Sequence, residues 1–285
     1  MANKSPKTVE FDVFLGNGTI NELEQAKIVM KNQLIRKQTK WSVTEVKLFY
    51  SALSQIKKRD ENCWVKLKKR DIIEMLNMRE KDVSSLRQMF VSVKNKSDVH
   101  FDEDEDLNGL DGSLIRNIRT TKKEVYVQFD DMYLPLLDEL SSNFTTFYLD
   151  NIVLMKSKHA INLFTYLKSV YYPIRPIQHR QISLDDLKKI FELDETDYVR
   201  TDAKRKGWFD VTNFRKKVIN QAVTDINQWG TGMEIQNVEP IRRGGIVGFE
   251  FTYLLRNRDG SVRDDYECLF KPSQYKLEQI KQEEF

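Results

Sequence analysis

The residue types that usually carry out catalysis or bind metals are few in this sequence and widely separated. Its three histidines, His100, His159 and His179, show none of the spacings of a metal site or of a histidine acid–base pair. The two cysteines, Cys63 and Cys268, are too far apart for a metal knuckle or a disulfide framework. No glycine precedes a lysine, so a phosphate-binding P-loop is absent, and neither a dinucleotide fingerprint nor a nucleophile elbow occurs. We therefore expect no catalytic site, no bound metal and no cofactor.

Clustered charges point instead to binding. The acidic run at residues 102–106 lacks an EF-hand register, so we interpret it as a solvated loop. Residues 200–217, by contrast, contain only two acidic residues and seven basic ones: Arg200, Lys204, Arg205, Lys206, Arg215, Lys216 and Lys217. The whole chain has a net charge of only +3, so this excess is local. Lysine and arginine at this density are typical of surfaces that neutralise the phosphates of nucleic acids.

Length and composition limit the architecture that must position these charges. A chain of 285 residues is too long for one ordinary domain, and its 40% hydrophobic content is enough for buried cores. Its apolar runs are far shorter than the roughly 20 residues that span a bilayer. The polar N-terminus has no apolar stretch typical of a signal peptide. We expect a cytoplasmic protein with a flexible leader at residues 1–24 and a charged tail at residues 257–285.

Between leader and tail, hydrophobic periodicity predicts a similar order of elements twice. In residues 25–140, Ser42 and Glu45 form a possible capping box. The helices expected there span residues 43–56, 72–76 and 82–95, with strands at 63–67, 114–119 and 124–129. In residues 145–256, a strand-like segment at 144–154 precedes helices around 160–170, 183–191 and 211–228, followed by strands at 233–238 and 246–255. Each half is therefore expected to hold three helices and a closing hairpin.

The two halves can be aligned by hand on their apolar positions. Phe49 falls opposite Phe164 and Ile72 opposite Leu187, both at an offset of 115 residues. Three helices closed by a two-stranded hairpin form a winged helix, whose third helix enters the DNA major groove. The sequence therefore predicts an α+β fold of two tandem winged-helix domains related by an internal repeat.

The third helix of the second half separates into an apolar and a polar face. At about 100° per residue, one stripe holds the apolar residues Val211, Phe214, Val218, Ala222 and Ile226. The opposite face holds Asn213, Lys216, Lys217, Asn220, Thr224 and Asn227. Asparagine suits adenine, and lysine suits guanine or phosphate. Arg215 lies on the flank, where its long stem could extend outward, and Arg242 and Arg243 lie at the hairpin turn. We predict that this helix, its basic loop and the turn bind double-stranded DNA.

The corresponding helix of the first half is less basic. Its polar face holds Lys81, Ser84, Gln88, Ser92 and Asn95, with Lys94 and Lys96 near the end. We expect weaker DNA contacts from Lys81, Lys94 and Lys96, or a role chiefly in self-association. A first domain without any DNA contact is the alternative. The apolar strands and residues 133–140 are the candidate surface for dimers.

Two further segments of the sequence can be compared with those of known protein families. The first is KIVMKNQLI at residues 27–35, followed by the helix at 41–56; the second is NFRKKVINQA at residues 213–222, ending in DIN at 225–227. Together they resemble the initiator replication proteins of iteron-containing theta plasmids, over about residues 25–255. The resemblance implies a tandem winged-helix protein that binds direct repeats at a plasmid origin, mainly through its C-terminal domain. It also implies an N-terminal dimer interface, origin opening by monomers, promoter repression by dimers, and recruitment of the host initiator and replicative helicase.

Three other functions compete with this one. A winged-helix transcriptional regulator without replication activity has the same fold, and its target would be a single inverted repeat rather than direct repeats. A protein-interaction module would bind partners without the salt dependence of phosphate contacts. A DNA-nicking initiator is disfavoured, because the sequence has no His-x-His pair and no tyrosine followed three positions later by lysine.

Overall fold

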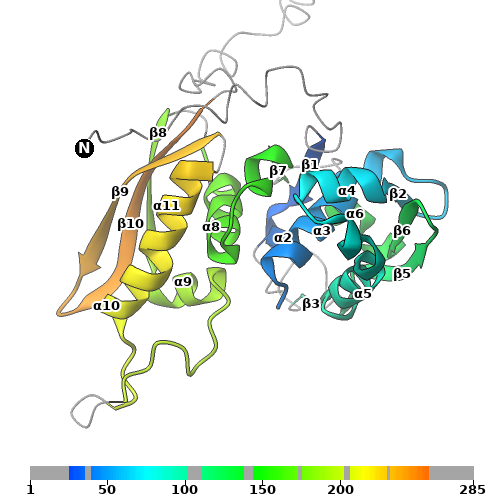
Figure 1. Cartoon of the computed structure of the whole chain (residues 1–285). Coiled ribbons are helices and arrows are strands. Elements are labelled where there is room, and N and C mark those ends of the chain that lie inside the picture. Colours follow the sequence, from blue (N-terminus) through cyan, green and yellow to red (C-terminus); the bar gives the residue numbers. More distant parts are fainter. Residues whose placement is uncertain are drawn as a thin grey trace, which may run out of the picture. The chain divides into compact units, whose positions relative to one another are not determined.

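The computed structural model describes seven stretches of the chain: residues 26–35, 40–101, 111–137, 144–172, 175–201, 206–229 and 232–256. They form two compact units, divided after Leu154 (Figure 1). The leader, the acidic loop at 102–106, the tail and the predicted DNA contacts Lys204 and Arg205 lie outside these stretches, as does the side chain of Lys81. No helix among the described residues is long and apolar enough to cross a membrane.

The first unit combines short helices with three small antiparallel sheets. In chain order its elements are β1 (Lys27–Lys31), α2 (Asn32–Ile35), α3 (Val43–Leu53), η1 (Ile56–Lys58), β2 (Trp64–Lys68), α4 (Lys69–Met75), η2 (Glu80–Ser85), α5 (Leu86–Asn95), β3 (Asp98–His100), β4 (Asp111–Ser113), β5 (Ile115–Thr120), β6 (Glu124–Phe129), η3 (Asp131–Tyr133), α6 (Leu134–Leu137), β7 (Phe144–Tyr148) and α7 (Asp150–Val153). The largest sheet has the order β2-β6-β5, while β3 pairs with β4 and β1 with β7.

Helix α3 begins where the sequence predicts. The Ser42 hydroxyl accepts a hydrogen bond from the Glu45 amide at 3.3 Å, and the Glu45 carboxylate accepts one from the Ser42 amide at 2.6 Å. This reciprocal pair satisfies two amides that lack partners inside the helix, and it confirms the predicted capping box. The apolar side of α3 is buried through Val46, Phe49 and Leu53.

The described residues of the second unit form one three-stranded sheet and five helical segments. Its elements are α8 (Lys158–Ser169), β8 (Ile177–Ser183), α9 (Leu184–Ile190), α10 (Val211–Phe214), η4 (Arg215–Ile219), α11 (Asn220–Trp229), β9 (Met233–Arg242) and β10 (Ile246–Leu255). The segments α10, η4 and α11 follow one another without interruption and form the predicted third helix, with a π-helical turn at η4. The sheet order is β8-β10-β9.

The two units share one topology, which confirms the predicted repeat. In each unit the strand before α4 or α9 (β2 or β8) pairs with the second strand of the hairpin (β6 or β10), which pairs in turn with the first strand of the hairpin (β5 or β9). Strand β8 was not predicted from the sequence. This edge strand exposes His179, Arg180 and Gln181 and buries only Ile182, so its hydrophobic alternation is weak.

The segment expected to open the second domain has a different place. Residues 144–148 form β7, which pairs antiparallel with β1 along its whole length, from Lys31 opposite Phe144 to Lys27 opposite Tyr148. This pairing ties the segment to the first unit, and the compact second unit begins at Met155 rather than at residue 145. Periodicity identified a strand here, but it did not reveal a partner more than a hundred residues earlier.

Strand β10 carries the inner face of the second sheet. Phe249, Phe251 and Tyr253 are buried as alternation predicts, whereas Val247 is exposed, because the pairing shifts between Ile246 and Gly248. A Cβ at Gly248 would lie 2.3 Å from the Ile182 carbonyl oxygen of β8. Only glycine allows the two backbones to approach this closely.

Candidate nucleic-acid interface

The third helix of the second unit starts at a capping aspartate. The Asp210 carboxylate accepts a hydrogen bond from the Asn213 amide at 3.1 Å, and the Arg200 guanidinium lies 3.3 Å away. The hydrogen bond from Asn213, together with the charge of Arg200, lowers the pKa of Asp210. Arg200, which the sequence assigns to DNA, thus also pairs with the residue that caps the helix.

A wider turn in the middle of this helix keeps its apolar stripe aligned. Apolar residues four apart on an α-helix drift by about 40° per step, because each residue turns the chain by about 100°. The π-helical turn at η4 counteracts this drift. The stripe that stays buried consists of Phe214, Val218, Ile219, Ala222 and Ile226, which confirms the predicted core face apart from the half-buried Val211.

The other side of the helix is a row of polar side chains in contact with solvent. Lys216, Lys217, Asn220 and Thr224 are exposed, and Asn213 is half-buried. The Thr224 hydroxyl donates a hydrogen bond to the Asn220 carbonyl at 2.8 Å, which leaves the Asn220 amide group outside that contact. This face offers two cationic groups followed by amide and hydroxyl groups, which is the chemistry that reads phosphates and base edges.

Two residues that the sequence places near this face bind the sheet instead. The Arg215 guanidinium donates a hydrogen bond to the Val238 carbonyl at 3.1 Å and lies over the Phe249 ring, 5.6 Å from its centre. It therefore points toward β9 and β10 rather than outward as expected. The Asn227 amide exchanges two hydrogen bonds of 2.8 Å with the backbone of Ile235. Both side chains fix the helix against the wing.

These contacts also place the wing turn at the N-terminal end of the helix. Asn227 meets the start of β9 and Arg215 meets its second half, so the strand runs back along the helix toward its beginning. Arg242 and Arg243 at the turn are exposed. The turn closes with a hydrogen bond of 2.8 Å from the Arg243 amide to the Gly245 carbonyl, and Gly244 has a φ of 69°. Figure 1 shows the turn and α10 at the same end of the unit.

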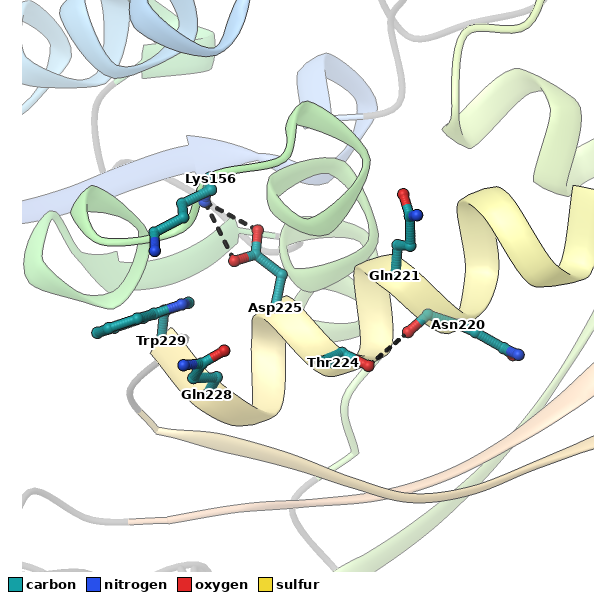
Figure 2. A pocket seen from close by; sticks show the side chains of 7 residues that line it. All are labelled: Lys156, Asn220, Gln221, Thr224, Asp225, Gln228 and Trp229. Carbon is teal, nitrogen blue, oxygen red and sulfur yellow. Dashed lines mark hydrogen bonds between the residues drawn. The ribbon is translucent and has the colours of Figure 1, made fainter. Parts of the chain in front are cut away.

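Lys156 is a cation beside this helix that was not predicted from the sequence. Asp225 of α11 is buried and accepts hydrogen bonds from the amides of Lys156 and Ser157 at 2.8 and 2.7 Å. The Lys156 ammonium lies over the Trp229 ring, 4.5 Å from its centre. Figure 2 shows the shallow pocket that results, whose remaining lining comes from Asn220, Gln221, Thr224 and Gln228. Lys156 is distant in sequence from the basic cluster, and only the packing of α11 reveals it.

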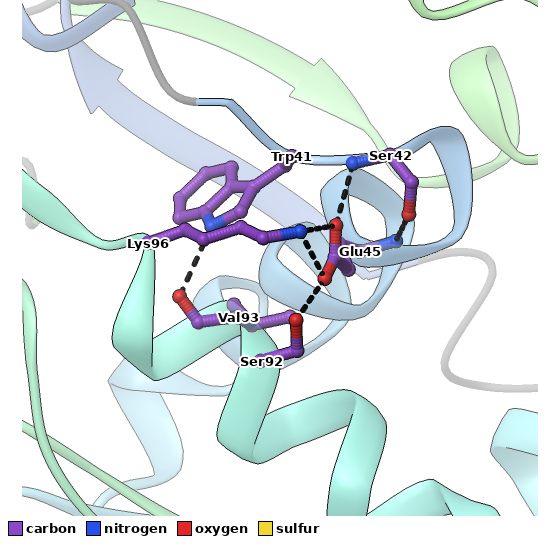
Figure 3. Close-up of polar contacts among 6 residues, drawn as sticks. All are labelled: Trp41, Ser42, Glu45, Ser92, Val93 and Lys96. Carbon is purple, nitrogen blue, oxygen red and sulfur yellow. Dashed lines mark hydrogen bonds and ion pairs between the residues drawn. The ribbon is translucent and has the colours of Figure 1, made fainter.

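The third helix of the first unit uses its polar groups differently. The Lys96 ammonium bonds both carboxylate oxygens of Glu45, at 2.8 and 2.9 Å, and the Ser92 hydroxyl donates to the same carboxylate (Figure 3). The Trp41 indole N–H donates to the Val93 carbonyl at 3.0 Å. Lys96, predicted to contact DNA, therefore joins α5 to α3. Lys94 is half-buried, while Ser84, Gln88 and Asn95 are exposed.

The carboxylate of Glu45 is held in its charged form. Burial alone would raise its pKa, but the hydrogen bonds from Lys96, Ser42 and Ser92 outweigh burial and lower the pKa from 4.5 to about 2. The cluster is thus a structural ion pair over the whole neutral range.

Comparison with known proteins follows the same division. A model described as "Initiator Replication protein, WH1" matches residues 27–168, and one described as "Initiator Rep protein, WH2" matches residues 183–253. This chain belongs to the initiator replication protein family. The family places one winged helix in each half, which confirms the predicted fold class. Its first domain extends past Leu154 into α8.

Two solved structures are similar to this chain to different degrees. The crystal structure of Pi initiator protein in complex with iteron DNA matches with a TM-score of 0.63 and 15% identity, over 82% of this chain and 99% of that chain. A crystal structure of domains 2 and 3 of RctB matches with a TM-score of 0.43 and 11% identity, over 77% and 85% of the two chains. Among curated proteins, none matches this sequence.

Proposed function

We propose that this initiator-family protein is a plasmid replication initiator that binds directly repeated sites, the iterons, at an origin. The observation that carries the proposal is the exposed row of Lys216, Lys217, Asn220 and Thr224 on the third helix of the second winged helix. The Pi initiator, which shares the fold, is known in complex with iteron DNA, and this supports duplex DNA as the partner.

In the proposed complex, α10–α11 lies in the major groove. Asn213 and Asn220 face adenine edges, and Lys216 and Lys217 face guanine or phosphate. The remaining contacts go to the DNA backbone and come from Arg200, Lys204, Arg205, Lys206, Arg242 and Arg243, and we add Lys156, which lies beside α11. Arg215 acts indirectly, because its hydrogen bond to Val238 sets the distance between the helix and the wing.

The two winged helices have unequal roles in this proposal. The second one, within residues 145–256, supplies most of the DNA reading. The first, within residues 25–140, supplies dimerisation and weaker DNA contacts, among which Lys94 and Lys81 remain candidates. Lys96 can take part only by giving up its ion pair with Glu45.

Origin binding leads to the remaining steps that we propose. Bound monomers help to open the origin and recruit the host initiator and replicative helicase, whereas dimers repress the promoter of the protein's own gene. None of these steps needs a bond to be made or broken by the protein, and all of them take place in the cytoplasm.

Footprinting of the purified full chain on the DNA that flanks its own gene tests the proposal. We expect evenly spaced protection of direct repeats, with an affinity that falls steeply between about 50 and 200 mM salt because phosphate contacts release counterions. One protected palindrome would favour a transcriptional regulator without replication activity. Absence of protection at every salt concentration would contradict DNA binding altogether.

A further inference from the structure

Trp208 has the highest exposed fraction, 67%, of the large hydrophobic side chains that the structure describes. It lies in the segment that leads into α10, two residues before the capping Asp210. A single exposed apolar residue is common on protein surfaces, so exposure alone decides nothing. The hydrogen-bonded backbone that carries this indole and the lysines near that segment distinguish Trp208 from other exposed apolar residues.

The backbone on both sides of Trp208 is fixed by hydrogen bonds. The Arg200 amide donates to the Trp208 carbonyl at 2.8 Å, and the Gly207 amide donates to the Arg200 carbonyl at 3.0 Å. Val199 and Phe209 form an antiparallel bridge next to them. Gly207 has a φ of 86°, a left-handed conformation that suits glycine. The indole is therefore presented by an ordered segment and not by a loose one.

An aromatic cluster anchors this segment on the third helix. The Phe209 ring lies 5.2 Å from the ring of the fully buried Phe214, and the Tyr198 ring lies 5.9 Å from it. Neighbouring residues of an extended segment point to opposite sides. With Phe209 turned inward onto Phe214, Trp208 is turned outward at a fixed position relative to α10.

Two lysines lie near the segment that carries the indole. Lys206 is exposed two residues away, and the ammonium of Lys188 lies over the Phe209 ring at 4.7 Å from its centre. A partner that suits this place is negatively charged, accepts a hydrogen bond from the indole N–H and offers an apolar surface to the ring. A deoxyribose with its phosphate has all three properties.

We propose that Trp208 contacts the DNA backbone at the edge of the groove that α10 enters. Its ring packs on a deoxyribose, and its Nε1–H donates to a phosphate oxygen. This inference rests on the proposed function and adds to it a contact that releases no counterion. The contact therefore increases affinity without steepening the salt dependence, unlike a contact between a lysine and a phosphate.

The test measures binding of the full chain to a duplex that carries the footprinted repeat, by fluorescence anisotropy over a salt series. We expect Trp208→Ala to bind about ten-fold more weakly with an unchanged salt slope, whereas Lys206→Ala should lower the slope by about one. Trp208→Phe, which keeps a ring and loses the N–H, should lie between wild type and Trp208→Ala.

Tyr172→Ala is the matched control. Tyr172 is 63% exposed and precedes Ile177, which pairs with Leu254 at the end of β10 far from the wing turn. We expect this variant to bind like wild type. Wild-type affinity in both Trp208 variants would overturn the inference and leave the proposed function standing. A wild-type protein that binds no duplex would overturn both.

Discussion

The third helices α5 and α10–α11 occupy the same place in the topology of the two units. In both units a carboxylate joins the third helix to the first, but that carboxylate is on the first helix in one unit and on the third helix in the other. In the first unit, Glu45 of α3 binds Ser92 and Lys96 of α5. In the second unit the carboxylate is on the third helix, where Asp225 binds the backbone amides at the start of α8.

The alignment offset of 115 residues explains this difference. It places the buried Ala160 of α8 opposite Glu45, so the second unit has no carboxylate there that could bind a lysine of its third helix. Asp225 pairs with backbone amides instead, and Lys216 and Lys217 are exposed. A polar residue on a third helix is thus not a DNA contact by position alone. Its availability depends on the partners that the neighbouring helix offers.

The largest expected effect tests the buried core of each unit. Phe90 of α5 and Phe214 of α10 are fully buried, so Phe90→Ala and Phe214→Ala should each lower the free energy of unfolding by about 3–5 kcal/mol. Urea denaturation followed by circular dichroism measures both. An unchanged midpoint for Phe214→Ala would contradict the orientation of the helix on which the whole interface depends.

The second prediction compares DNA binding by the polar faces of the two third helices. Replacing both Lys216 and Lys217 with alanine should weaken binding to the repeat by tens-fold, and should lower the salt slope by about two. Lys94→Ala in the first unit should have a much smaller effect on both quantities. Equal losses from the two helices, measured by anisotropy across salt concentrations, would mean that the first unit also reads DNA strongly.

A third prediction concerns the ion pair between Glu45 and Lys96 in the first unit. Glu45→Gln should lower the free energy of unfolding by about 2 kcal/mol near neutral pH, since hydrogen bonds to a charged group are lost. The pKa of Glu45 is lowered in the folded state, from 4.5 to about 2, so its contribution is present above pH 4.5 and is lost as the pH falls toward 2. The stability difference between wild type and variant should shrink over this range. A difference that stays constant with pH would contradict the ion pair.

The smallest expected effect tests the role of Arg215. Arg215→Ala removes one hydrogen bond to Val238 and should cost about 1 kcal/mol of stability. Its salt slope for DNA binding should equal that of wild type, because the side chain is turned toward the sheet. A slope lowered by about one would instead restore Arg215 as a phosphate contact.

Regular periodicity made most of the fold predictable. The capping box at Ser42, the stripe from Phe214 to Ile226 and the alternation of β6 each depend on residues close in sequence. The edge strand β8 and the β1–β7 ribbon were not recognised, because an exposed edge has weak alternation and a distant partner leaves no local signal.

For the candidate site, the sequence predicted only which side of the third helix is exposed. Helical phase placed Lys216, Lys217 and Asn220 on the outer face. It could not show that Arg215 reaches Val238 or that Lys96 reaches Glu45, because both contacts come from packing between separate elements. Lys156 and Trp208 carry no motif, and only their surroundings in three dimensions distinguish them from other surface residues.

The π-turn at η4 has a consequence for how this helix can change. A π-turn holds one residue more than the α-turn it replaces, so loss of one residue within it restores an α-turn and leaves the side chains beyond it pointing in nearly the same direction. Loss of a residue elsewhere in the helix would rotate those side chains by about 100°. Lys216 and Lys217 lie within the turn, while Asn220 and Thr224 lie after it. The turn therefore allows this helix to gain or lose one residue at η4 while the polar face beyond it keeps its orientation.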